Sequence, residues 1–387
     1  MRAIGLMSGT SLDGIDAALV DLRPQGASYA WTIRRFVTVP FEDDLLDRLR
    51  AALPPNIATV AQIAALDRDL GDAFAAAAVT IARGEHADFV ASHGLTIYHR
   101  GEESQTLQIG DPFRIREAVA ATVVFDFRRA DCALGGQGAP LVPYVDAMLL
   151  ARDDRDVVAL NIGGIANATV LAAGGTFAEA LAWDTGPGNM LIDTIVARRT
   201  QDRERFDRDG ARAARGTIDD GIVRELIARD AFYFVQPPPK TTGRERFGAQ
   251  LLDAHAELFA DLPLDDACAT LAAFTIETIA SDLDRYGPAR GSLVISGGGA
   301  RNATLVAGLG ARLPQYEVVV SDMRGIDADA KEALAFAVLG YESLRERPAN
   351  VPRATGAARG AVLGAIVPYG LASLLAKIGA EVAANES

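Results

Sequence analysis

Apolar residues near the start of the chain form two short runs that flank a polar turn. The runs cover residues 4–7 and 17–21, and the turn, SGTSLDGID at 8–16, concentrates glycines, hydroxyls and carboxylates. Alternating apolar positions on either side of a glycine turn predict a β-hairpin. The segment DVVALNIGGIANATVLA at 156–172 repeats this arrangement. The sequence therefore predicts two glycine-turned hairpins in separate halves of the chain.

Helical and strand-like patterns alternate between the two hairpins. An alanine-rich run with apolar positions at helical spacing covers residues 57–83. Two short apolar strands follow it, DFVASHG at 88–94 and TVVFDF at 122–127, and each ends in polar residues. This alternation indicates an α/β fold, in which ligands gather at the carboxyl ends of the strands.

Three segments after the second hairpin continue the alternation. Residues 183–199 predict a strand end, a Gly/Pro turn and a helix that begins near Pro187, because proline is tolerated in the first turn of a helix. Residues 291–313 predict a strand, a triple-glycine turn and a helix. Residues 327–344 predict a helix with Glu332 near its start.

The chain is long enough for two domains, since its 387 residues exceed one typical core. The stretch ALGGQGAPLVP at 133–143 concentrates glycine and proline and is the expected first boundary. We therefore expect domains at 1–132 and 133–354, with residues 355–387 completing the first domain.

Composition narrows the classes of partner. The chain is 49% hydrophobic and 23% charged, as is typical of soluble globular proteins, and it has no signal-peptide pattern and no apolar run of the roughly 18 residues that a membrane helix requires. The net charge of −13 argues against nucleic acid or an anionic membrane as a partner. Two cysteines cannot form a disulfide framework, and they fit a reducing compartment, so we expect a cytoplasmic location.

The opening turn fits a phosphate site of an unusual kind. Ile15 and Asp16 stand where a P-loop needs Lys and Ser/Thr, and the strand after the glycines does not suit a dinucleotide-binding loop, which precedes a helix. What remains is a hairpin whose N–H groups and hydroxyls face phosphate oxygens, with Asp13 or Asp16 available to Mg²⁺. The alternative is an ordinary hairpin with a hydrophilic tip. The expected ligands of this turn are Gly9, Thr10, Ser11, Leu12, Asp13, Gly14, Ile15 and Asp16.

The second hairpin and the triple-glycine turn strengthen this interpretation. Together with the first turn they give three surfaces rich in backbone N–H groups that can surround one nucleotide. The expected nucleotide ligands here are Asn161, Gly163, Gly164, Asn167, Gly297, Gly298, Gly299 and Asn302.

The motifs together resemble the anhydro-N-acetylmuramic acid kinase family, which belongs to a superfamily with sugar kinases, actin and Hsp70-type ATPases. The resemblance covers nearly the whole chain and rests on GLMSGTSLDGIDAALVD, SHGLTIYH, TLQIGDP, DFRRADCALGGQGAPLVPYVD, NIGGIANATV, WDTGPGNMLID, KTTGRERF, SGGGARN and KEALAFAVL. It implies a two-lobed actin-like ATPase (ribonuclease H-like) fold with ATP in the interlobe cleft, closure of the lobes during turnover, Mg²⁺ as cofactor and a homodimer. The implied reaction converts 1,6-anhydro-N-acetylmuramic acid, ATP and water to N-acetylmuramic acid 6-phosphate and ADP.

Asp184 is the expected catalytic base. Opening an acetal ordinarily takes two carboxyl groups, but here the departing O6 can be captured by the γ-phosphoryl group of ATP, so one carboxylate suffices to activate the water. Asp184 stands at a strand end beside a Gly/Pro turn, and the resemblance implies that it is the general base. The alternative is that Asp184 only caps the following helix.

The expected sugar ligands come from both predicted domains and are His93, Thr96, Arg128, Gly186 and Glu332. For three of them the residues alone leave another interpretation open. His93 is a hydrogen-bond donor to the sugar or a satisfied, partly buried histidine. Arg128 faces the ligand or forms a surface ion pair, and Glu332 contacts the sugar or is an exposed first-turn glutamate. The four histidines include no H-x-x-x-H pair, so zinc is not expected.

Two further features distinguish this chain. Leu95 stands where the family usually has Gln, so a possible hydrogen bond near the sugar is lost and sugar affinity or selectivity is expected to change. Met7 stands where the superfamily usually has Asp. The loop QPPPKTTGRERFG at 236–248 carries Lys240, Arg244 and Arg246, which either approach the phosphates or form a mobile basic loop.

Two other functions are consistent with the motifs. The first is a sugar kinase that phosphorylates a free hydroxyl without hydrolysis. The second is an ATP-dependent clamp or binding module, which would need a partner-binding domain, yet only a short Gly/Ala-rich tail follows the last predicted helix.

Overall fold

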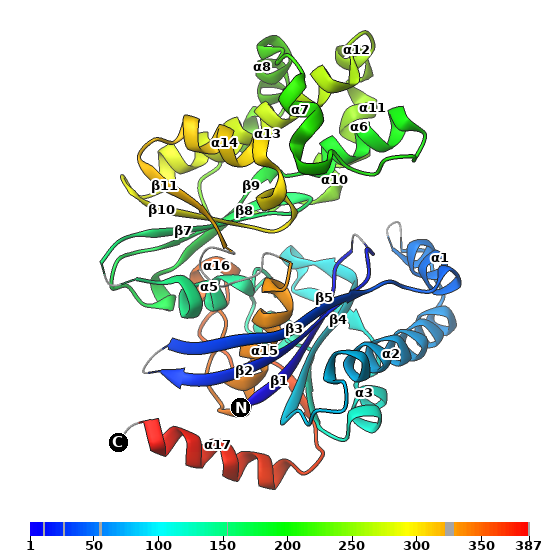
Figure 1. Ribbon diagram of the computed structural model, residues 1–387, viewed down its shortest axis with the longest axis vertical. Helices are drawn as coiled ribbons and strands as arrows, with labels where there is room; N and C mark the ends of the chain where they lie inside the picture. Colours follow the sequence, from blue (N-terminus) through cyan, green and yellow to red (C-terminus); the bar gives the residue numbers. More distant parts are fainter. Residues whose placement is uncertain (11, 26–27, 54–55, 153, 322–328, 386–387) are drawn as a thin grey trace. The chain divides into compact units, whose positions relative to one another are not determined.

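The computed structural model describes residues 1–385 apart from 11, 26–27, 54–55, 153 and 322–328, and the chain forms two compact units. Unit 1 comprises Met1–Leu149 and Ala330–Ser387, and unit 2 comprises Leu150–Asp329. Each unit contains its own β-sheet (Figure 1).

The unit boundaries differ from those expected at 132/133 and 354/355. The glycine-rich stretch 133–143 is held within unit 1, where the Gln137 N–H donates to the Thr355 carbonyl oxygen at 2.8 Å and the Ala358 N–H donates to the Leu134 carbonyl oxygen at 3.0 Å. Its glycines and prolines therefore form turns of unit 1 and not a linker.

The sheet of unit 1 has seven strands. They are β1 (Arg2–Ser8), β2 (Ile15–Gln25), β3 (Ser28–Val39), β4 (Phe89–Arg100), β5 (Gln105–Ile109), β6 (Thr122–Phe125) and β12 (Ala365–Val367). The central order is β3-β2-β1-β4-β6, with β1, β2 and β3 antiparallel and β4 and β6 parallel to β1. Strands β5 and β12 add to β4 and β6 in antiparallel pairing. The predicted opening hairpin is thereby confirmed.

Helices cover both faces of this sheet (Figure 1). They are α1 (Asp43–Ala52), α2 (Val60–Ala82), α3 (Pro112–Val119), α4 (Arg129–Cys132), α5 (Val142–Leu150), α15 (Lys331–Leu344), α16 (Pro352–Thr355) and α17 (Leu371–Asn385). The predicted helix at 57–83 begins only at Val60, because Thr59 and Gln62 form a capping box. Helix α15 lies close against the sheet, since a Cβ on Gly5 would be 1.8 Å from the Ala333 carbonyl oxygen.

The sheet of unit 2 repeats the topology of the first. Its strands are β7 (Val157–Ile162), β8 (Ile165–Leu171), β9 (Leu181–Pro187), β10 (Gly291–Ser296) and β11 (Tyr316–Val320). The order is β9-β8-β7-β10-β11, with β7, β8 and β9 antiparallel and β10 and β11 parallel to β7. Two sheets of this order, each opening with an antiparallel meander, confirm the predicted α/β, ribonuclease H-like class.

The helices of unit 2 enclose a core built around the long helix α13. They are α6 (Met190–Thr200), α7 (Ala211–Arg215), α8 (Asp220–Arg229), α9 (Ala231–Val235), α10 (Arg244–Phe247), α11 (Ala249–Ala254), α12 (Ala256–Phe259), α13 (Leu264–Tyr286) and α14 (Ala303–Arg312). The helix predicted to begin near Pro187 forms, but Pro187 does not lie in its first turn. Pro187 ends β9, where it pairs with Ile165, and α6 begins at Met190.

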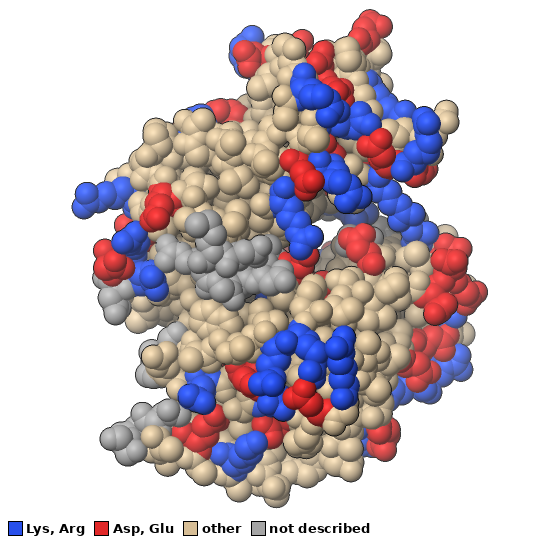
Figure 2. Space-filling view, in the orientation of Figure 1, with Lys and Arg blue, Asp and Glu red and all other residues tan. Residues whose placement is uncertain are grey.

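Charged side chains of both signs are mixed over the face shown in Figure 2. No broad basic area appears on this face, although the chain carries 38 Lys and Arg residues against 51 Asp and Glu residues. None of the helices in the described part of the chain has the length and apolar character needed to cross a bilayer.

Candidate active site

The turn between β1 and β2 is shaped by its backbone. The Ser8 hydroxyl donates to the Gly14 carbonyl oxygen at 2.8 Å, and the Leu12 N–H donates to the Gly9 carbonyl oxygen at 3.1 Å. Gly14 has a φ of +154°, and a Cβ there would lie 2.6 Å from the Val39 carbonyl oxygen. The turn is therefore closed, and it accepts no side chain at Gly14.

The predicted ligands of this turn divide between surface and core. Thr10 and Asp13 are exposed and Gly9 is partly exposed, whereas the side chains of Leu12 and Ile15 are buried. Leu12 and Ile15 can therefore offer only their backbone to a ligand.

The two carboxylates considered for Mg²⁺ differ in setting. Asp16 lies on β2, where its Oδ1 accepts from the Thr38 hydroxyl at 2.6 Å, while Asp13 lies on the exposed turn. Within the described ranges of the chain, no three His, Cys, Asp or Glu side chains cluster as a metal site. One or two carboxylates do fit Mg²⁺, which keeps several waters and binds mainly through substrate phosphates. Ser11, also predicted in this turn, lies outside the described residues.

The tip of the β7–β8 hairpin is fixed by the turn before α6. The Gly188 N–H donates to the Gly164 carbonyl oxygen at 2.9 Å, and the Asn189 N–H donates to the Gly163 carbonyl oxygen at 2.8 Å. A Cβ on Gly163 would nevertheless have no neighbour closer than 3.6 Å. The tip is thus rigid, with an open face at Gly163.

The triple-glycine turn after β10 packs beside this tip. Gly297 has a φ of +76°, and a Cβ there would lie 2.6 Å from Asn161 Oδ1; a Cβ on Gly299 would lie 2.5 Å from a β7 side chain. Gly298 is exposed, and its nearest neighbour would be Asn189 Nδ2 at 3.7 Å. The structure therefore brings together the predicted glycines of unit 2.

The two remaining predicted nucleotide ligands of unit 2 have different settings. Asn167 pairs with Asn161 across the hairpin, and both are partly exposed. Asn302 is buried and caps α14, with its Oδ1 accepting from the Leu305 N–H at 3.1 Å. The carboxamide oxygen of Asn302 therefore stabilises the start of α14.

Asp184 lies on β9 opposite Asn167, at a β-bulge of this pair of strands. The Thr242 N–H donates to Asp184 Oδ2 at 2.8 Å. The Asp184 N–H donates to the Lys240 carbonyl oxygen at 2.9 Å, and the Tyr233 hydroxyl donates to the Asp184 carbonyl oxygen at 2.6 Å. Backbone and carboxylate are therefore both held in place, on the strand next to the hairpin with the glycine tip.

The alternative that Asp184 caps the following helix is wrong. Helix α6 begins at Met190 and has Asn189 as its N-cap residue.

Gly186, predicted to bind the sugar, is buried with a φ of +140°, and a Cβ there would lie 3.1 Å from the Phe234 ring. Gly186 thus allows the chain to turn where a side chain would strain the backbone.

In unit 1, His93 is a satisfied, buried histidine, as one of the two interpretations held. Arg128 Nε donates to His93 Nε2 at 3.0 Å, so the other ring nitrogen, Nδ1, carries the proton and donates to the Gly94 carbonyl oxygen at 3.0 Å. Burial and the Arg128 charge hold the pKa of His93 well below its ordinary value. With Arg128 Nη1 also donating to the Gly138 carbonyl oxygen at 2.9 Å, His93 acts as a support for Arg128.

Arg128 and Glu332 influence each other within unit 1. Burial lowers the pKa of Arg128 to about 10, with the Glu332 charge opposing that change. Burial raises the pKa of Glu332, against the charges of Lys331 and Arg128. By accessible surface both side chains are partly buried, so Glu332 is not the exposed first-turn glutamate of the alternative interpretation, and the ligand contact of Arg128 stays a prediction. Thr96 accepts from Gln108 Nε2 at 3.1 Å and is partly buried.

Position 95 does not face a ligand. The Leu95 side chain is completely buried in the apolar core of unit 1, together with Phe74 and Ile109. The expectation that this residue tunes sugar selectivity by direct contact is thus wrong, because its side chain points into the core.

The basic residues of the loop at 236–248 are not uniformly exposed. Lys240 is buried and pairs with Asp282, with Nζ 2.9 Å from Oδ2. Arg246 pairs with Asp230 at 2.8 Å, and Arg244 is exposed. The Lys240 ammonium is therefore engaged inside unit 2 by Asp282.

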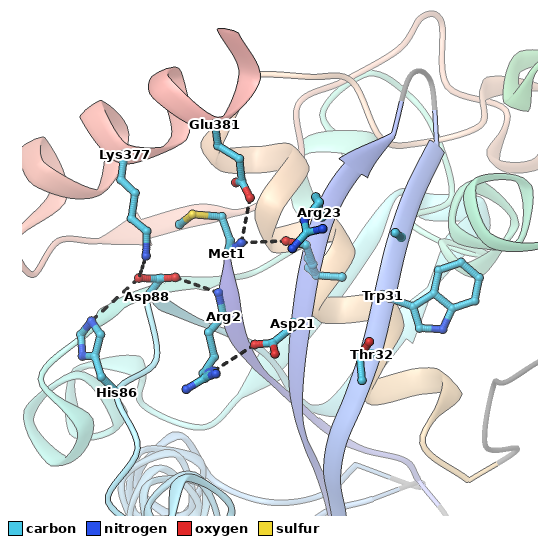
Figure 3. Close-up of a pocket in the computed structure, with 12 residues that line it drawn as sticks. Met1, Arg2, Asp21, Arg23, Trp31, Thr32, His86, Asp88, Lys377 and Glu381 are labelled. Atoms are coloured by element: carbon cyan, nitrogen blue, oxygen red, sulfur yellow. Dashed lines mark hydrogen bonds and ion pairs between the residues drawn. The ribbon is translucent and has the colours of Figure 1, made fainter. Parts of the chain in front are cut away.

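A cavity of about 540 Å³ in unit 1 does not coincide with the predicted site (Figure 3). Several of its charged groups form ion pairs, such as Arg2–Asp21 at 2.9 Å and Lys377–Asp88 at 2.6 Å. The residues that line it are Met1, Arg2, Asp21, Leu22, Arg23, Ala30, Trp31, Thr32, His86, Asp88, Lys377 and Glu381. None of these residues was predicted to bind ligand.

Three residues that contact or support Asp184 were not predicted from the sequence. Thr242 holds the carboxylate, Tyr233 holds the backbone, and Asp282 anchors Lys240. Of the three, only Thr242 lies in a motif that the sequence identified, KTTGRERF. The basic residues of that motif indicated a charged contact and not a hydrogen bond from the Thr242 N–H.

Comparison with known proteins agrees with the predicted family. A family model described as anhydro-N-acetylmuramic acid kinase matches residues 1–369. Proteins named anhydro-N-acetylmuramic acid kinase from Streptomyces coelicolor and Rhodococcus erythropolis are 44% and 42% identical to this chain, over 95% of it and 94% of each relative. A protein of the same name from Caldanaerobacter subterraneus is 39% identical, over 94% of this chain and 96% of its own. This chain therefore belongs to the anhydro-N-acetylmuramic acid kinase family, and it is a kinase.

Proposed function

We propose that this kinase hydrolytically opens 1,6-anhydro-N-acetylmuramic acid and phosphorylates O6 with ATP, giving N-acetylmuramic acid 6-phosphate and ADP in the recycling of cell-wall sugars. The observation that best supports this proposal is the position of Asp184. Its carboxylate is held by the Thr242 N–H on the strand beside the hairpin that ends in Gly163 and Gly164. A base and a phosphate-binding turn on adjacent strands suit a reaction in which hydrolysis and phosphoryl transfer are coupled.

In the proposed mechanism Asp184 takes a proton from the water that attacks C1. The C1–O6 bond breaks, and O6 with its electron pair attacks the γ-phosphorus of ATP while the bond from that phosphorus to the β,γ-bridging oxygen breaks. The products are the free sugar hydroxyl at C1, the 6-phosphate and ADP, and the proton passes from Asp184 to solvent. Positioning and charge stabilisation account for most of the catalysis in such transfers.

The glycine turns form the proposed nucleotide site. We propose that the turn at Gly9–Gly14 in unit 1 and the turns at Gly163–Gly164 and Gly297–Gly299 in unit 2 offer backbone N–H groups to the phosphates of ATP. Asp13 or Asp16 would hold Mg²⁺, which would supply positive charge to the phosphates.

The proposed sugar site depends on Arg128 and Glu332, with Thr96 and Gly186 as further contacts. His93 and the Gly138 carbonyl oxygen fix the guanidinium of Arg128, so it meets the sugar with little loss of side-chain freedom. Glu332 accepts hydrogen bonds from sugar hydroxyls or orients Arg128.

A cytoplasmic location and a homodimer complete the proposal. The free thiols Cys132 and Cys268 support a reducing compartment, because they are buried and form no disulfide. Sedimentation of the purified chain at several concentrations tests the dimer.

Substitution of Asp184 tests the proposed function. Asp184→Asn keeps the side-chain volume but removes basicity, so turnover should fall by about 10²-fold or more while ATP and anhydrosugar still bind in calorimetry. The matched control is Asp253→Asn, which removes an exposed carboxylate of unit 2 that pairs with Arg198. Near-full activity of Asp184→Asn would contradict the assignment.

The product mass separates this function from a simple sugar kinase. The anhydrosugar reaction adds one water to the sugar in addition to the phosphoryl group, whereas a simple kinase adds only the phosphoryl group. A panel of anhydrosugars and free sugars with ATP decides between the two.

A further inference from the structure

A buried ion pair lies behind the strand that carries Asp184. Lys240 Nζ is 2.9 Å from Asp282 Oδ2, and both side chains are only 2% exposed. Trp183 Nε1 donates to the same Oδ2 at 3.0 Å, and the Lys240 ammonium lies 4.7 Å from the centre of the Tyr233 ring. Four elements of unit 2 therefore meet at this pair: β9, α9, α13 and the loop before α10.

Each end of this network is connected to Asp184. The Lys240 carbonyl oxygen accepts from the Asp184 N–H at 2.9 Å, and two residues later the Thr242 N–H donates to the carboxylate at 2.8 Å. Tyr233, whose ring the ammonium faces, donates its hydroxyl to the Asp184 carbonyl oxygen at 2.6 Å. The segment from Lys240 to Thr242 thus pairs with Asp184 through both backbone and side chain.

Stability alone is a poor explanation for this ion pair. Burying two charges costs desolvation free energy that their attraction often fails to exceed, and apolar residues of similar volume fill such a space equally well. The charged pair differs from apolar packing because its hydrogen bonds are directional. An ammonium held by one carboxylate and one carbonyl oxygen restricts the positions that the backbone at Lys240 can take. Lys240 Nζ lies 3.1 Å from Asp282 Oδ1 and 3.4 Å from the Tyr233 carbonyl oxygen.

We propose that Lys240 is a positioning residue, whose buried pair with Asp282 fixes the 240–242 segment so that the Thr242 N–H orients the carboxylate of Asp184 toward the attacking water. This inference rests on the proposed function of Asp184 as the base. It gives Lys240 a role other than the phosphate contact or mobile loop that its sequence suggested.

The role predicts a specific effect on pH dependence. A hydrogen bond from an N–H group stabilises a carboxylate, so its loss raises the pKa of the base and moves the acidic limb of the rate profile to higher pH. Tyr233 and Asp282, the two side chains that connect Lys240 to Asp184, are themselves acted on by charged groups of unit 2. These groups are Asp230, Lys240, Arg246 and Arg285, and they contribute to the same field.

The experiment compares three variants of the full-length enzyme with ATP and the anhydrosugar. Lys240→Met removes the charge and keeps much of the volume. The double variant Lys240→Met/Asp282→Asn also removes the charge left alone by the first change and keeps an acceptor for Trp183. Leu309→Ala, in the core of unit 2, is the control for lost stability without a change near Asp184. Turnover, both KM values, the pH profile and Tm are measured for each.

Both Lys240 variants should lose about tenfold or more in turnover, as supporting residues around a reactive group commonly do, with an unchanged KM for ATP and an acidic limb at higher pH. The double variant should recover Tm but not turnover. Leu309→Ala should lower Tm and leave the profile of the wild type.

Two results would overturn the inference. One is a wild-type profile and turnover in the double variant, and the other is a control that shifts the acidic limb as much as the Lys240 variants do. Failure of the proposed function is distinguishable from these, because it appears as an active Asp184→Asn enzyme.

Discussion

Substitution of single glycines at or beside the β7–β8 tip can distinguish an effect on ligand binding from an effect on folding. A side chain on Gly163 meets nothing closer than 3.6 Å at its Cβ, so Gly163→Val should fold normally. It occupies the space proposed for phosphates, and the KM for ATP should rise about tenfold or more, equivalent to about 1.4 kcal/mol, with the KM for sugar unchanged. Steady-state kinetics with each substrate varied provides the measurement.

Gly188 provides the matched control for this prediction. A Cβ at Gly188 would lie 2.3 Å from the Gly163 carbonyl oxygen, so Gly188→Ala displaces the tip and should lower Tm. Equal changes in both KM values for Gly163→Val would show that the tip does not bind ATP.

Leu95 is a core position although it lies within a ligand motif. Leu95→Gln places an amide in an apolar core, and it should lower the free energy of unfolding by about 2 kcal/mol or more. Denaturant unfolding measures the loss, and the KM for sugar of the folded enzyme should stay unchanged. A stable variant with a changed KM for sugar would place position 95 in the sugar site.

At the scale of elements, Asp265 connects the first turn of α13 to α7. It pairs with Arg212 and Arg215, both at 2.9 Å, and the hydrogen bond from Arg215 is the main cause that lowers its pKa despite partial burial. Because the folded pKa is below the unfolded one, the contribution to stability is present at neutral pH and is lost as the pH falls through the folded pKa.

Asp265→Asn should therefore be less stable than the wild type by about 1 kcal/mol or less at pH 7. The difference in Tm should begin to shrink as the pH falls below about 4, where the carboxyl of the unfolded chain takes up a proton, and it should disappear once the folded wild-type carboxyl is also protonated. Thermal melts of both proteins between pH 3 and 7 test this. A deficit that is independent of pH would mean that the carboxylate charge contributes nothing.

The elements that the sequence predicted well are those with a strong local pattern. Both hairpins and the strand–turn–helix at 291–313 have alternating apolar positions around glycine, and all three form. The end of β4 was misjudged because the residues after His93 continue the strand to Arg100 by pairing with β5, a partner that the local pattern does not contain.

The sequence predicted the parts of the candidate site that are formed by backbone turns better than the parts formed by side chains. Glycine turns are recognisable in the sequence, and Asp184 stands on the strand that leads into one of them. Whether Lys240 or Leu95 points outward depends on tertiary packing, and the sequence alone suggested the wrong side for each.

At the scale of the whole molecule, the proposed phosphate-binding turns belong to different units. We predict that ATP and sugar together draw the units toward each other, as is common in enzymes that enclose their substrates. Small-angle scattering should give a smaller radius of gyration with an ATP analogue and sugar than without ligands. Identical curves would contradict closure.

The central claim is that water attacks C1 while O6 accepts the phosphoryl group. The most direct measurement is mass spectrometry of products formed by the wild type in ¹⁸O-labelled water, with fragmentation that separates the C1 hydroxyl from the phosphate. The label should appear on C1 and not in the newly formed phosphate ester, because phosphorus receives O6 of the sugar. Label in the phosphate ester, or a product without added water, would contradict this account.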